Sequence, residues 1–454
     1  MTTRRQANPQ NRSSKFDHDQ QPLCPDSAAP IPSLYLKARI RHPLIYRKRI
    51  DHVDRNAKPG DWVAVYAPPQ ESIESAPDAA EPRPSPAPAL GDMELWGYGI
   101  YNPRSEIALR MIRFGSKLPD DAFWQERLAR AVRLRTELLK VPDVADAYRV
   151  LNSEGDGFPG LVVDRFGDVL SAELYSWGMW QRSRELLRRL AEICGTQHLV
   201  IRTAPKMLSQ EGFDPPPYFS ENAPRSVVIQ EFGTRFRIDL SEASHKTGFF
   251  CDQRDNRARL AKFCAGKSVL DLCCYTGGFA LQAKTLGQAA EVTGVDLDEQ
   301  PLQMAKDNAN LNRATIRFVQ ADVFPYMRDM LREGRQFDVV VLDPPKLINS
   351  RAEIEEGTRT HFDLNRLAMQ LVKTGGLLLT CSCAGLLPES EFARLVFSAS
   401  KQAGSPIDDA GIRRGPRPAR LLFRTGAAGD HPVASNCPEG EYLKAAWITL
   451  DDPL

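Results

Sequence analysis

The C-terminal half of the chain alternates between short apolar runs and longer segments with helical periodicity. Apolar runs that predict buried strands lie at 268–273, 291–295, 315–319, 337–342 and 375–381. Amphipathic stretches with helical spacing separate these runs. Strand–helix alternation of this kind is typical of parallel βαβ units, so we predict an α/β fold with a doubly wound, Rossmann-like sheet over residues 241–454.

The N-terminal half has two parts with different patterns. Residues 33–116 contain short strand-like runs separated by turns, which predict a small β-barrel; the Pro-, Ala- and acid-rich stretch 67–92 is predicted to be a flexible insertion in it. Residues 117–240 combine helical spacing at 119–140 with several strand-like runs, and predict a small α/β domain. Residues 1–32 are polar and are predicted to form a disordered tail.

Composition excludes several classes of protein. The 59 basic and 58 acidic side chains give a net charge of +1, so any contact with nucleic acid must come from local basic patches. We find no apolar run of about 18 residues and no secretory signal, and therefore expect a cytoplasmic protein without membrane association. The nine cysteines lack zinc-finger spacing. We therefore predict reduced thiols and no metal site.

Three acidic residues stand at the ends of successive predicted strands: Asp271, Asp296 and Asp322. The carboxyl ends of parallel strands meet at one edge of the sheet, where ligands bind. There, Asp271 can engage an amino-acid ammonium group, Asp296 ribose hydroxyls, and Asp322 an adenine amino group. Gly277 and Gly278 follow the first strand and would let a ligand approach the backbone. Together these residues predict a site for an adenosyl cofactor, S-adenosylmethionine (SAM).

Two further elements are predicted to face the same crevice. Asp343 ends the fourth strand and precedes Pro-Pro, a stiff, extended turn that would hold its carboxylate beside the transferable methyl group. Cys381 and Cys383 end the fifth strand. A thiolate there can add to C6 of a pyrimidine and make C5 nucleophilic, after which a base must remove the C5 proton. We predict that Cys383 is this nucleophile; the alternative is a buried structural cysteine.

Basic residues cluster in two places. The first cluster is interleaved with Tyr35 and Tyr46 and predicts a surface that contacts RNA phosphates and stacks bases, although a solvated strand face is the alternative. It comprises Lys37, Arg39, Arg41, Arg47, Lys48 and Arg49. The second cluster is predicted to lie near the crevice. It comprises Arg413, Arg414, Arg417, Arg420 and Arg424.

Several motifs resemble the ribosomal large-subunit RNA methyltransferase I family, whose members make 5-methylcytidine in 23S rRNA. Arg41-His-Pro and Pro59-Gly-Asp are similar to the family's N-terminal PUA domain. Further similar motifs follow in the family's order over almost the whole chain. They lie at 152–167, 245–257, 270–279, 343–346, 382–383 and 430–433.

The resemblance implies a class I SAM-dependent methyltransferase that acts on large-subunit rRNA, uses Cys383 as nucleophile and forms a homodimer. It also implies that Gln253 and Arg254 lie against the cofactor. With the first turn and the strand-end acids, the predicted cofactor site comprises Gln253, Arg254, Asp271, Tyr275, Thr276, Gly277, Asp296, Asp322 and Asp343.

The chain departs from the expected pattern at two points. Cys381 stands where we expect another residue type, and the Asp-Pro-Pro turn is followed by Lys346 where some RNA cytosine methyltransferases have a second cysteine. We therefore assign removal of the C5 proton to Asp343. Two other functions stay open: methylation of an exocyclic guanine nitrogen in rRNA, which needs no thiol, and a non-catalytic RNA-binding assembly factor. An NAD dehydrogenase is disfavoured because no GxGxxG opens the first helix.

Overall fold

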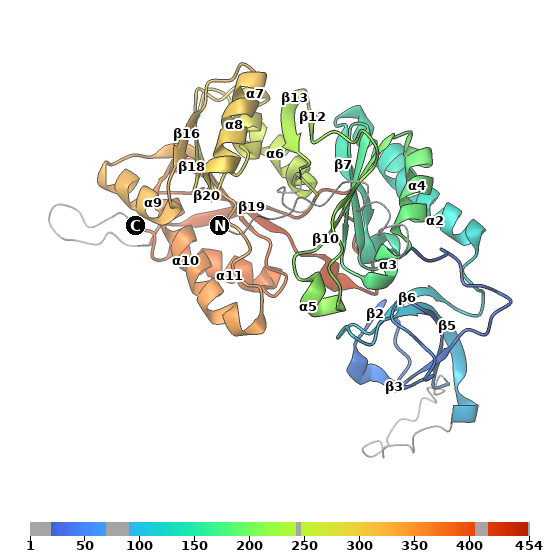
Figure 1. Cartoon of the computed structure of the whole chain (residues 1–454). Helices are drawn as coiled ribbons and strands as arrows, with labels where there is room; N and C mark the ends of the chain where they lie inside the picture. Colours follow the sequence, from blue (N-terminus) through green and yellow to red (C-terminus); the bar gives the residue numbers. More distant parts are fainter. Residues whose placement is uncertain (1–19, 70–89, 242–246, 405–415, 453–454) are drawn as a thin grey trace, which may run out of the picture.

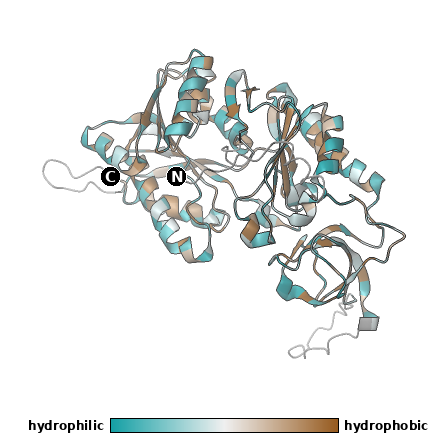
Figure 2. Cartoon of the chain, in the orientation of Figure 1, coloured by the Kyte–Doolittle hydropathy of each residue, from teal (hydrophilic) through white to brown (hydrophobic). Residues whose placement is uncertain are grey.

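The computed structural model describes residues 20–69, 90–241, 247–404 and 416–452. They form three units: an N-terminal curled sheet, a central sheet with helices, and a C-terminal sheet covered by helices on both faces (Figure 1). Apolar residues concentrate in the strands and polar residues on the outer faces of the helices (Figure 2). No helix in the described part of the chain is long and apolar enough to cross a membrane.

The N-terminal unit is a six-stranded sheet in the order β2-β6-β5-β4-β1-β3. Its strands are β1 (Ser33–Leu36), β2 (Leu44–Ile45), β3 (Ile50–Val53), β4 (Trp62–Ala67), β5 (Glu94–Tyr101) and β6 (Leu109–Phe114). The sheet curls around a hydrophobic cluster of its own that includes Leu34, Val63 and Leu109. Residues 70–89, most of the predicted insertion, lie outside the described residues.

The predicted disordered tail is wrong for residues 20–32. Leu23 is only 4% exposed and belongs to the hydrophobic core of the central unit. The backbone N–H of Gln21 donates to the carbonyl of Gln181 at 2.7 Å, and the side chain of Gln20 donates to the carbonyl of Trp180 at 3.1 Å. Leu23, with Cys24 and Ile31 packed against the same cluster and with these hydrogen bonds, thus orders a segment whose composition is mostly polar. Residues 1–19 lie outside the described part.

The central unit is a five-stranded mixed sheet in the order β11-β10-β9-β8-β7. Its strands are β7 (Ala147–Asn152), β8 (Leu161–Phe166), β9 (Val169–Leu174), β10 (His198–Thr203) and β11 (Tyr218–Phe219). Its helices are α2 (Asp121–Arg133), α3 (Trp177–Trp180), α4 (Ser183–Cys194) and α5 (Met207–Glu211). Helix α2 starts where the carboxylate of Asp120 accepts from the N–H of Phe123 at 2.8 Å, and it continues as a π-helical turn, Leu134–Leu138.

The hairpin β12 (Ser226–Glu231) and β13 (Thr234–Asp239) connects the central and C-terminal units. On the central side, Ala145 forms a β-bridge with Glu231. On the other side, the N–H of Arg237 donates to the side chain of Asn308 at 2.7 Å, and Arg257 forms a buried ion pair with Glu231 at 2.7 Å. The hairpin therefore packs on both units.

The C-terminal unit has a seven-stranded sheet in the order β16-β15-β14-β17-β18-β20-β19. Its strands are β14 (Ser268–Leu272), β15 (Glu291–Asp296), β16 (Arg317–Gln320), β17 (Phe337–Leu342), β18 (Val372–Ser382), β19 (Ala419–Thr425) and β20 (Lys444–Leu450). The first five are parallel, as predicted, whereas β20 runs antiparallel to β18 and β19. From β14 at the centre, the strands that follow in sequence, β15 and β16, lie on one side, and β17 and β18 lie on the other. Ligands are expected at such a change of strand order, beyond the end of β14.

Helices cover both faces of this sheet (Figure 1). The helices are α6 (Arg254–Ala261), α7 (Gly278–Thr285), α8 (Glu299–Leu311), α9 (Val323–Arg332), α10 (Ile354–Gln370) and α11 (Glu389–Ser400). Residues of α6 and α7 pack on one face, against Val269 and Val341. Residues of α9, α10 and α11 pack on the other, against Leu270 and Leu342. Successive side chains along each strand point to opposite faces of the sheet, so the same strands supply apolar side chains to the helices on both faces.

A buried ionic network joins the central and C-terminal units. The carboxylate of Asp430 accepts from the guanidinium of Arg254 at 2.8 Å and from the backbone N–H of Arg149 at 2.9 Å. The carbonyl of Asp430 accepts from Arg135 at 2.7 Å, and Arg135 also binds both carboxylate oxygens of Asp156. Burial alone would raise the pKa of Asp430, but His431 and Arg254 together lower it.

We predict that Asp430→Ala lowers the free energy of unfolding by about 3–5 kcal/mol, because it leaves Arg254 buried without its main partner. Urea unfolding of the two proteins measures this difference. The matched control is Asp255→Ala, which removes the exposed second partner of Arg254 and should cost less than about 1 kcal/mol. Equal losses in both variants would contradict the assignment.

The Asp430 contribution should depend on pH. Because the folded-state pKa is lowered, the stabilisation is complete above the unfolded-state pKa of about 3.9 and is lost as the pH falls below it. The stability difference between the wild type and Asp430→Ala should therefore narrow below about pH 4. A difference that stays constant down to the acid transition would contradict this.

Candidate active site

The turn after β14 has an unusual backbone. Cys273 and Tyr275 have φ of +62° and +50°, in the left-handed region that non-glycine residues rarely adopt. Two hydrogen bonds to β15 hold the turn: the N–H of Cys274 donates to the carbonyl of Val295 at 3.0 Å, and the N–H of Tyr275 donates to the carboxylate of Asp296 at 2.7 Å. Backbone strain of this kind gathers at ligand sites, where the surroundings must enforce it.

The glycines of this turn are also required by the packing of the protein itself. Gly277 has φ +81°, and a Cβ there would lie 3.2 Å from Ala305 and 3.3 Å from Phe318. A Cβ on Gly278 would lie 3.2 Å from the side chain of Arg257. Both glycines therefore face protein atoms, and backbone conformation and close packing account for them. The expectation that they let a ligand approach the backbone stays a prediction.

The four predicted acids lie around this turn. The pKa of the Cys273 thiol is raised first by burial and then by the charges of Asp296, Asp343, Asp271 and Asp322, so all four carboxylates lie near it. Asp322 is exposed and also caps α9, because it accepts from the N–H of Phe324 at 2.8 Å. The topology thus brings residues that are far apart in sequence to one edge of the sheet.

Asp271 is fully buried and only half satisfied. One carboxylate oxygen accepts from the N–H of Ala280 at 2.9 Å, whereas Oδ1 has no partner among the described residues. Burial raises the pKa of Asp271 well above its usual range, and the charges of Asp343 and Asp296 raise it further. A buried acceptor without a donor is costly, so this atom fits the ammonium group of a bound SAM. The crevice passes this test for an adenosyl amino-acid cofactor.

Gln253 connects the Asp343 turn to the segment before α6. Its side-chain NH₂ donates to Oδ2 of Asp343 at 3.0 Å, and its oxygen accepts from Asn256 at 2.7 Å. The N–H of Asp343 donates to the carbonyl of Leu272 at 3.3 Å, at the end of β14. Gln253 and Asp343 therefore lie together near the end of β14, and their contact with the cofactor stays a prediction.

The two cysteines at the end of β18 differ in accessibility. Cys381 is buried, and burial followed by the charge of Asp343 raises the pKa of its thiol well above the usual range, while Gln253 hydrogen-bonds to it. Cys383 is partly exposed. Cys383 follows Ser382, the last residue of β18, and its charge acts on both the thiol of Cys381 and the ammonium group of Lys444. A partly exposed cysteine thus lies close to Cys381, which Gln253 hydrogen-bonds.

Two groups near Cys383 had not been predicted. The ammonium group of Lys444 on β20 donates to the carbonyl of Ala384 at 2.6 Å; burial lowers the pKa of Lys444, and the charge of Cys383 opposes this. His361 on α10 lies 3.2 Å from the hydroxyl of Ser382, and burial with the charge of Lys444 lowers its pKa to about 4. His361 is therefore neutral at physiological pH. Both residues lie in other elements, so no local motif marks them.

Arg254 is placed differently from our prediction. Its guanidinium is buried and pairs with Asp430 and Asp255, at 2.8 and 3.1 Å. These bonds direct it toward the central unit. Arg254 therefore fixes the start of α6, and its neighbour Gln253 is the residue that reaches the crevice.

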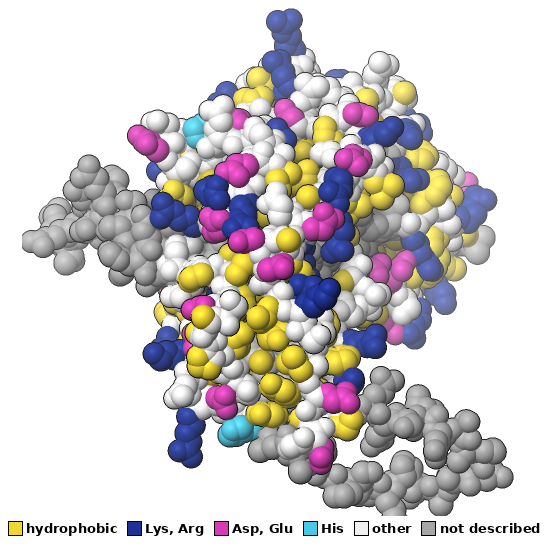
Figure 3. Space-filling view, turned by 90° about the vertical axis from the view of Figure 1, so that its right-hand side faces the viewer, with side chains coloured by type: hydrophobic (Ala, Val, Ile, Leu, Met, Phe, Trp, Pro, Cys, Tyr) yellow, Lys and Arg dark blue, Asp and Glu magenta, His cyan; other side chains and the backbone are white. Residues whose placement is uncertain are grey.

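The first basic cluster lies on the N-terminal sheet. Lys37, Arg41 and the helical turn Arg47–Arg49 are exposed, and the ring of Tyr46 beside them is 49% exposed. Arg39 is half-buried, pairs with Glu94 and lies 4.6 Å above the Trp96 ring. Elsewhere, basic and acidic side chains are interspersed, as on the face in Figure 3.

The second basic cluster was predicted to lie near the crevice, and the structure describes three of its residues, each of which has a partner. Arg417 is buried and donates to the carbonyls of Met369 and Asp451. Arg420 and Arg424 are exposed but pair with Asp451 and Glu389, respectively. Arg413 and Arg414 lie outside the described residues. Arg417 precedes β19, and its hydrogen bonds to backbone carbonyls of other elements, which no local motif marks, hold it inward.

One group of potential metal ligands occurs in the described part of the chain. The ligand atoms of His42, Cys437 and Glu439 lie within 4.8 Å of one another. His42 and Glu439 are 2.6 Å apart, which joins the N-terminal sheet to the loop before β20. The absence of a metal site stays a prediction.

Comparisons with known proteins agree with the fold and crevice. Residues 169–393 match the family model described as S-adenosylmethionine-dependent methyltransferase. The crystal structure of the methyltransferase SMU.776 complexed with SAH has a TM-score of 0.70 at 19% identity, covering 92% of this chain and 99% of that chain. The fold and the crevice define a SAM-dependent methyltransferase, and SAM is its cofactor.

Relatives with higher identity narrow this class. "Ribosomal RNA large subunit methyltransferase I" of Aeromonas salmonicida is 35% identical over 419 residues, 90% of this chain and 95% of that protein. The protein of the same name from Pseudoalteromonas atlantica is 32% identical over 410 residues, 89% of this chain and 94% of that protein. The chain belongs to the ribosomal RNA large subunit methyltransferase I family, which confirms the resemblance seen in its motifs.

We predict that Asp271→Asn weakens SAM binding by about tenfold or more. The N–H of Ala280 requires an acceptor, so the amide oxygen must stay there and the NH₂ must replace the unpartnered Oδ1. A donor would then face the ammonium group of the cofactor. Calorimetric titration measures the affinity. The thermal stability of the free variant should not fall, because the substitution removes a buried charge; an unchanged SAM affinity would contradict the role of Asp271.

Proposed function

We propose that this protein methylates C5 of a cytidine in large-subunit ribosomal RNA through a covalent bond between Cys383 and C6 of the base. The observation that carries the proposal is the partly exposed Cys383 just after β18, near Lys444 and near Cys381, to which Gln253 hydrogen-bonds. The names of the curated relatives supply the class of substrate. An exocyclic guanine nitrogen would need neither this thiol nor the cation beside it.

The covalent route begins with the Cys383 thiolate. Its sulfur forms a bond to C6 of the cytosine, and the C5–C6 double bond supplies the electron pair that makes C5 nucleophilic. Bound SAM supplies a methyl group that such a carbon can accept. The buried ammonium group of Lys444, fixed on the carbonyl of Ala384, favours the anionic form of the nearby thiol.

The product leaves after one proton transfer. A base removes the proton from C5, the C5–C6 double bond forms again, and the bond between C6 and sulfur breaks to release the thiolate. We assign the base to Asp343, whose carboxylate is oriented by the hydrogen bond from Gln253. In this assignment Gln253 is a positioning residue.

We propose that the N-terminal sheet is a PUA-like domain that binds RNA. Its exposed cations can neutralise phosphates, and the exposed ring of Tyr46 can stack on a base. These cations are Lys37, Arg41, Arg47, Lys48 and Arg49, with Arg39 beside them. The target base would have to leave its helix or loop to reach the crevice, at a cost of a few kcal/mol.

Replacement of each cysteine tests the covalent route. With rRNA from a gene-deletion strain as substrate, the Cys383→Ala protein should form no 5-methylcytidine, because no group remains to add to C6. The matched control is Cys381→Ala, two residues away. It should keep activity within about threefold and lose about 1 kcal/mol of stability through a small cavity. Mass spectrometry of digested rRNA reads the product. Full activity of Cys383→Ala would exclude the covalent route.

Charge reversal tests the RNA surface. The triple variant Arg47→Glu, Lys48→Glu and Arg49→Glu should weaken RNA binding by about tenfold or more at moderate salt, and its affinity should depend less steeply on salt concentration. Filter binding at several salt concentrations measures both. SAM affinity, measured in parallel, should be unchanged because the turn belongs to the N-terminal unit. RNA affinity and salt dependence equal to those of the wild type would contradict the assignment.

A further inference from the structure

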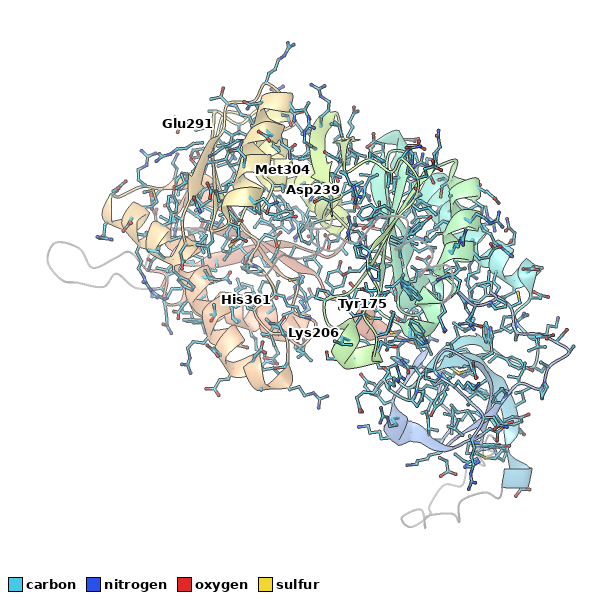
Figure 4. All side chains as sticks on the ribbon, in the orientation of Figure 1. Tyr175, Lys206, Asp239, Glu291, Met304 and His361 are labelled. Carbon is cyan, nitrogen blue, oxygen red and sulfur yellow. The ribbon has the colours of Figure 1, made fainter. Side chains whose placement is uncertain are left out.

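A chamber of about 440 Å³ lies where the three units meet, beside the catalytic crevice. The N-terminal sheet contributes Leu44 and Arg110 to its wall, and the central unit contributes Glu173 and Tyr175. Tyr175 is labelled in Figure 4, on the central unit beside α5. The segment before α6 and the loop before β20 complete the wall. The volume is in the range of small-molecule sites. None of the proposed catalytic residues lines it.

Asp252 places a carboxylate in the wall of this chamber. It is 8% exposed, its Oδ2 accepts from the hydroxyl of Tyr442 at 2.5 Å, and its carbonyl accepts from the N–H of Ala428 at 2.8 Å. Its Oδ1 is buried and has no partner. Among the described residues only Asp252 and Asp271 have a buried carboxylate oxygen without a partner. Asp252 is a residue of the chamber wall, and Asp271 lies in β14 at the predicted cofactor site.

One short helical turn links the chamber to the catalytic crevice. In Cys251–Gln253, Asp252 lines the chamber, while the next residue, Gln253, hydrogen-bonds to Asp343. Consecutive Cα atoms are about 3.8 Å apart. Phe250, in the chamber wall, also packs edge-on against Tyr275 of the cofactor turn, with ring centroids 5.2 Å apart. The segment 250–253 is therefore shared by the chamber wall and the surroundings of Asp343 and Tyr275.

The wall chemistry suits a nucleobase with an amino group. Phe249, Phe250 and Tyr442 provide aromatic surface for a flat ring. Asp252 provides a fixed acceptor, and a carboxylate is a good acceptor for an exocyclic amine such as N4 of cytosine. A buried acceptor of this kind rejects a ligand that lacks the donor, because the acceptor is then left unpaired.

We propose that the chamber binds an extrahelical nucleobase of the substrate RNA and that Oδ1 of Asp252 accepts a hydrogen bond from its exocyclic amino group. The proposal rests on the proposed RNA substrate and adds a residue that determines specificity. The amino group belongs either to the target cytidine or to an adjoining nucleotide.

A cycle of protein and RNA changes tests this. The protein change is Asp252→Ala. The RNA is a fragment around the mapped methylation site, in which single amino groups are deleted: pyrimidin-2-one riboside replaces cytidine, inosine replaces guanosine, and purine riboside replaces adenosine, at the target and at each neighbour. kcat/KM for methyl transfer is measured for each pair. SAM affinity and thermal stability are measured for each protein, and Asp252→Asn replaces Asp252→Ala if the latter does not fold.

For the wild type we expect one analogue to lower kcat/KM by about tenfold or more. Asp252→Ala should show a similar loss on unmodified RNA and no further loss with that analogue, while its SAM affinity stays within about twofold. The position of the sensitive analogue identifies the bound nucleotide. Tyr442→Phe, which leaves Oδ1 in place, should lose less activity than Asp252→Ala.

Two results would overturn the proposal. One is a kcat/KM of Asp252→Ala equal to that of the wild type. The other is that Asp252→Ala loses as large a factor in kcat/KM with every analogue as the wild type does. A methylated atom other than cytosine C5 would overturn only the proposed function, because the same cycle can be measured on whichever nucleotide receives the methyl.

Discussion

The buried ion pair between Asp430 and Arg254 is the contact on which the arrangement of the site depends. Asp430 lies in the loop before β20, and Arg254 begins α6. The same carboxylate accepts from the backbone of Arg149 in the central sheet. One buried acid thus fixes the central unit, the last loop and the first helix of the C-terminal unit. The turn before that helix presents Asp252 to the chamber and Gln253 to Asp343, so it is oriented by charges that touch no ligand.

A second constraint is the concentration of negative charge at one edge of the sheet. The neighbouring charges of Asp343 and Asp296 add to burial in raising the pKa of Asp271, so the crevice holds its acids at an energetic cost. A ligand with positive charge relieves that cost, and SAM carries both an ammonium group and a sulfonium. The positively charged Lys444 lies instead beside Cys383, where it favours an anion. The group of acids and the positively charged Lys444 thus lie beside different residues of the proposed site.

Much of the C-terminal unit could be predicted from the sequence, since its parallel strands are buried on both faces and read as continuous apolar runs. Acids at strand ends could be placed together for the same reason. Arg254 and Arg417 could not be placed, because a basic residue in a motif reads alike whether it faces solvent, ligand or a buried acid. Lys444 and His361 come close to Cys383 only through strand pairing and helix packing. The order of residues 20–32 depends on Leu23, Cys24 and Ile31, whose partner surface lies far along the chain.

The covalent bond between Cys383 and the target base is the central claim, and trapping it is the most direct test. RNA that carries 5-fluorocytidine at the methylated position would be incubated with the protein and SAM. Fluorine replaces the C5 proton that a base must remove, so the product cannot be released from the cysteine. We predict a protein–RNA adduct that survives denaturing electrophoresis and maps to the peptide containing Cys383. Methyl transfer to unmodified RNA without any such adduct, or an adduct on Cys381, would contradict the account.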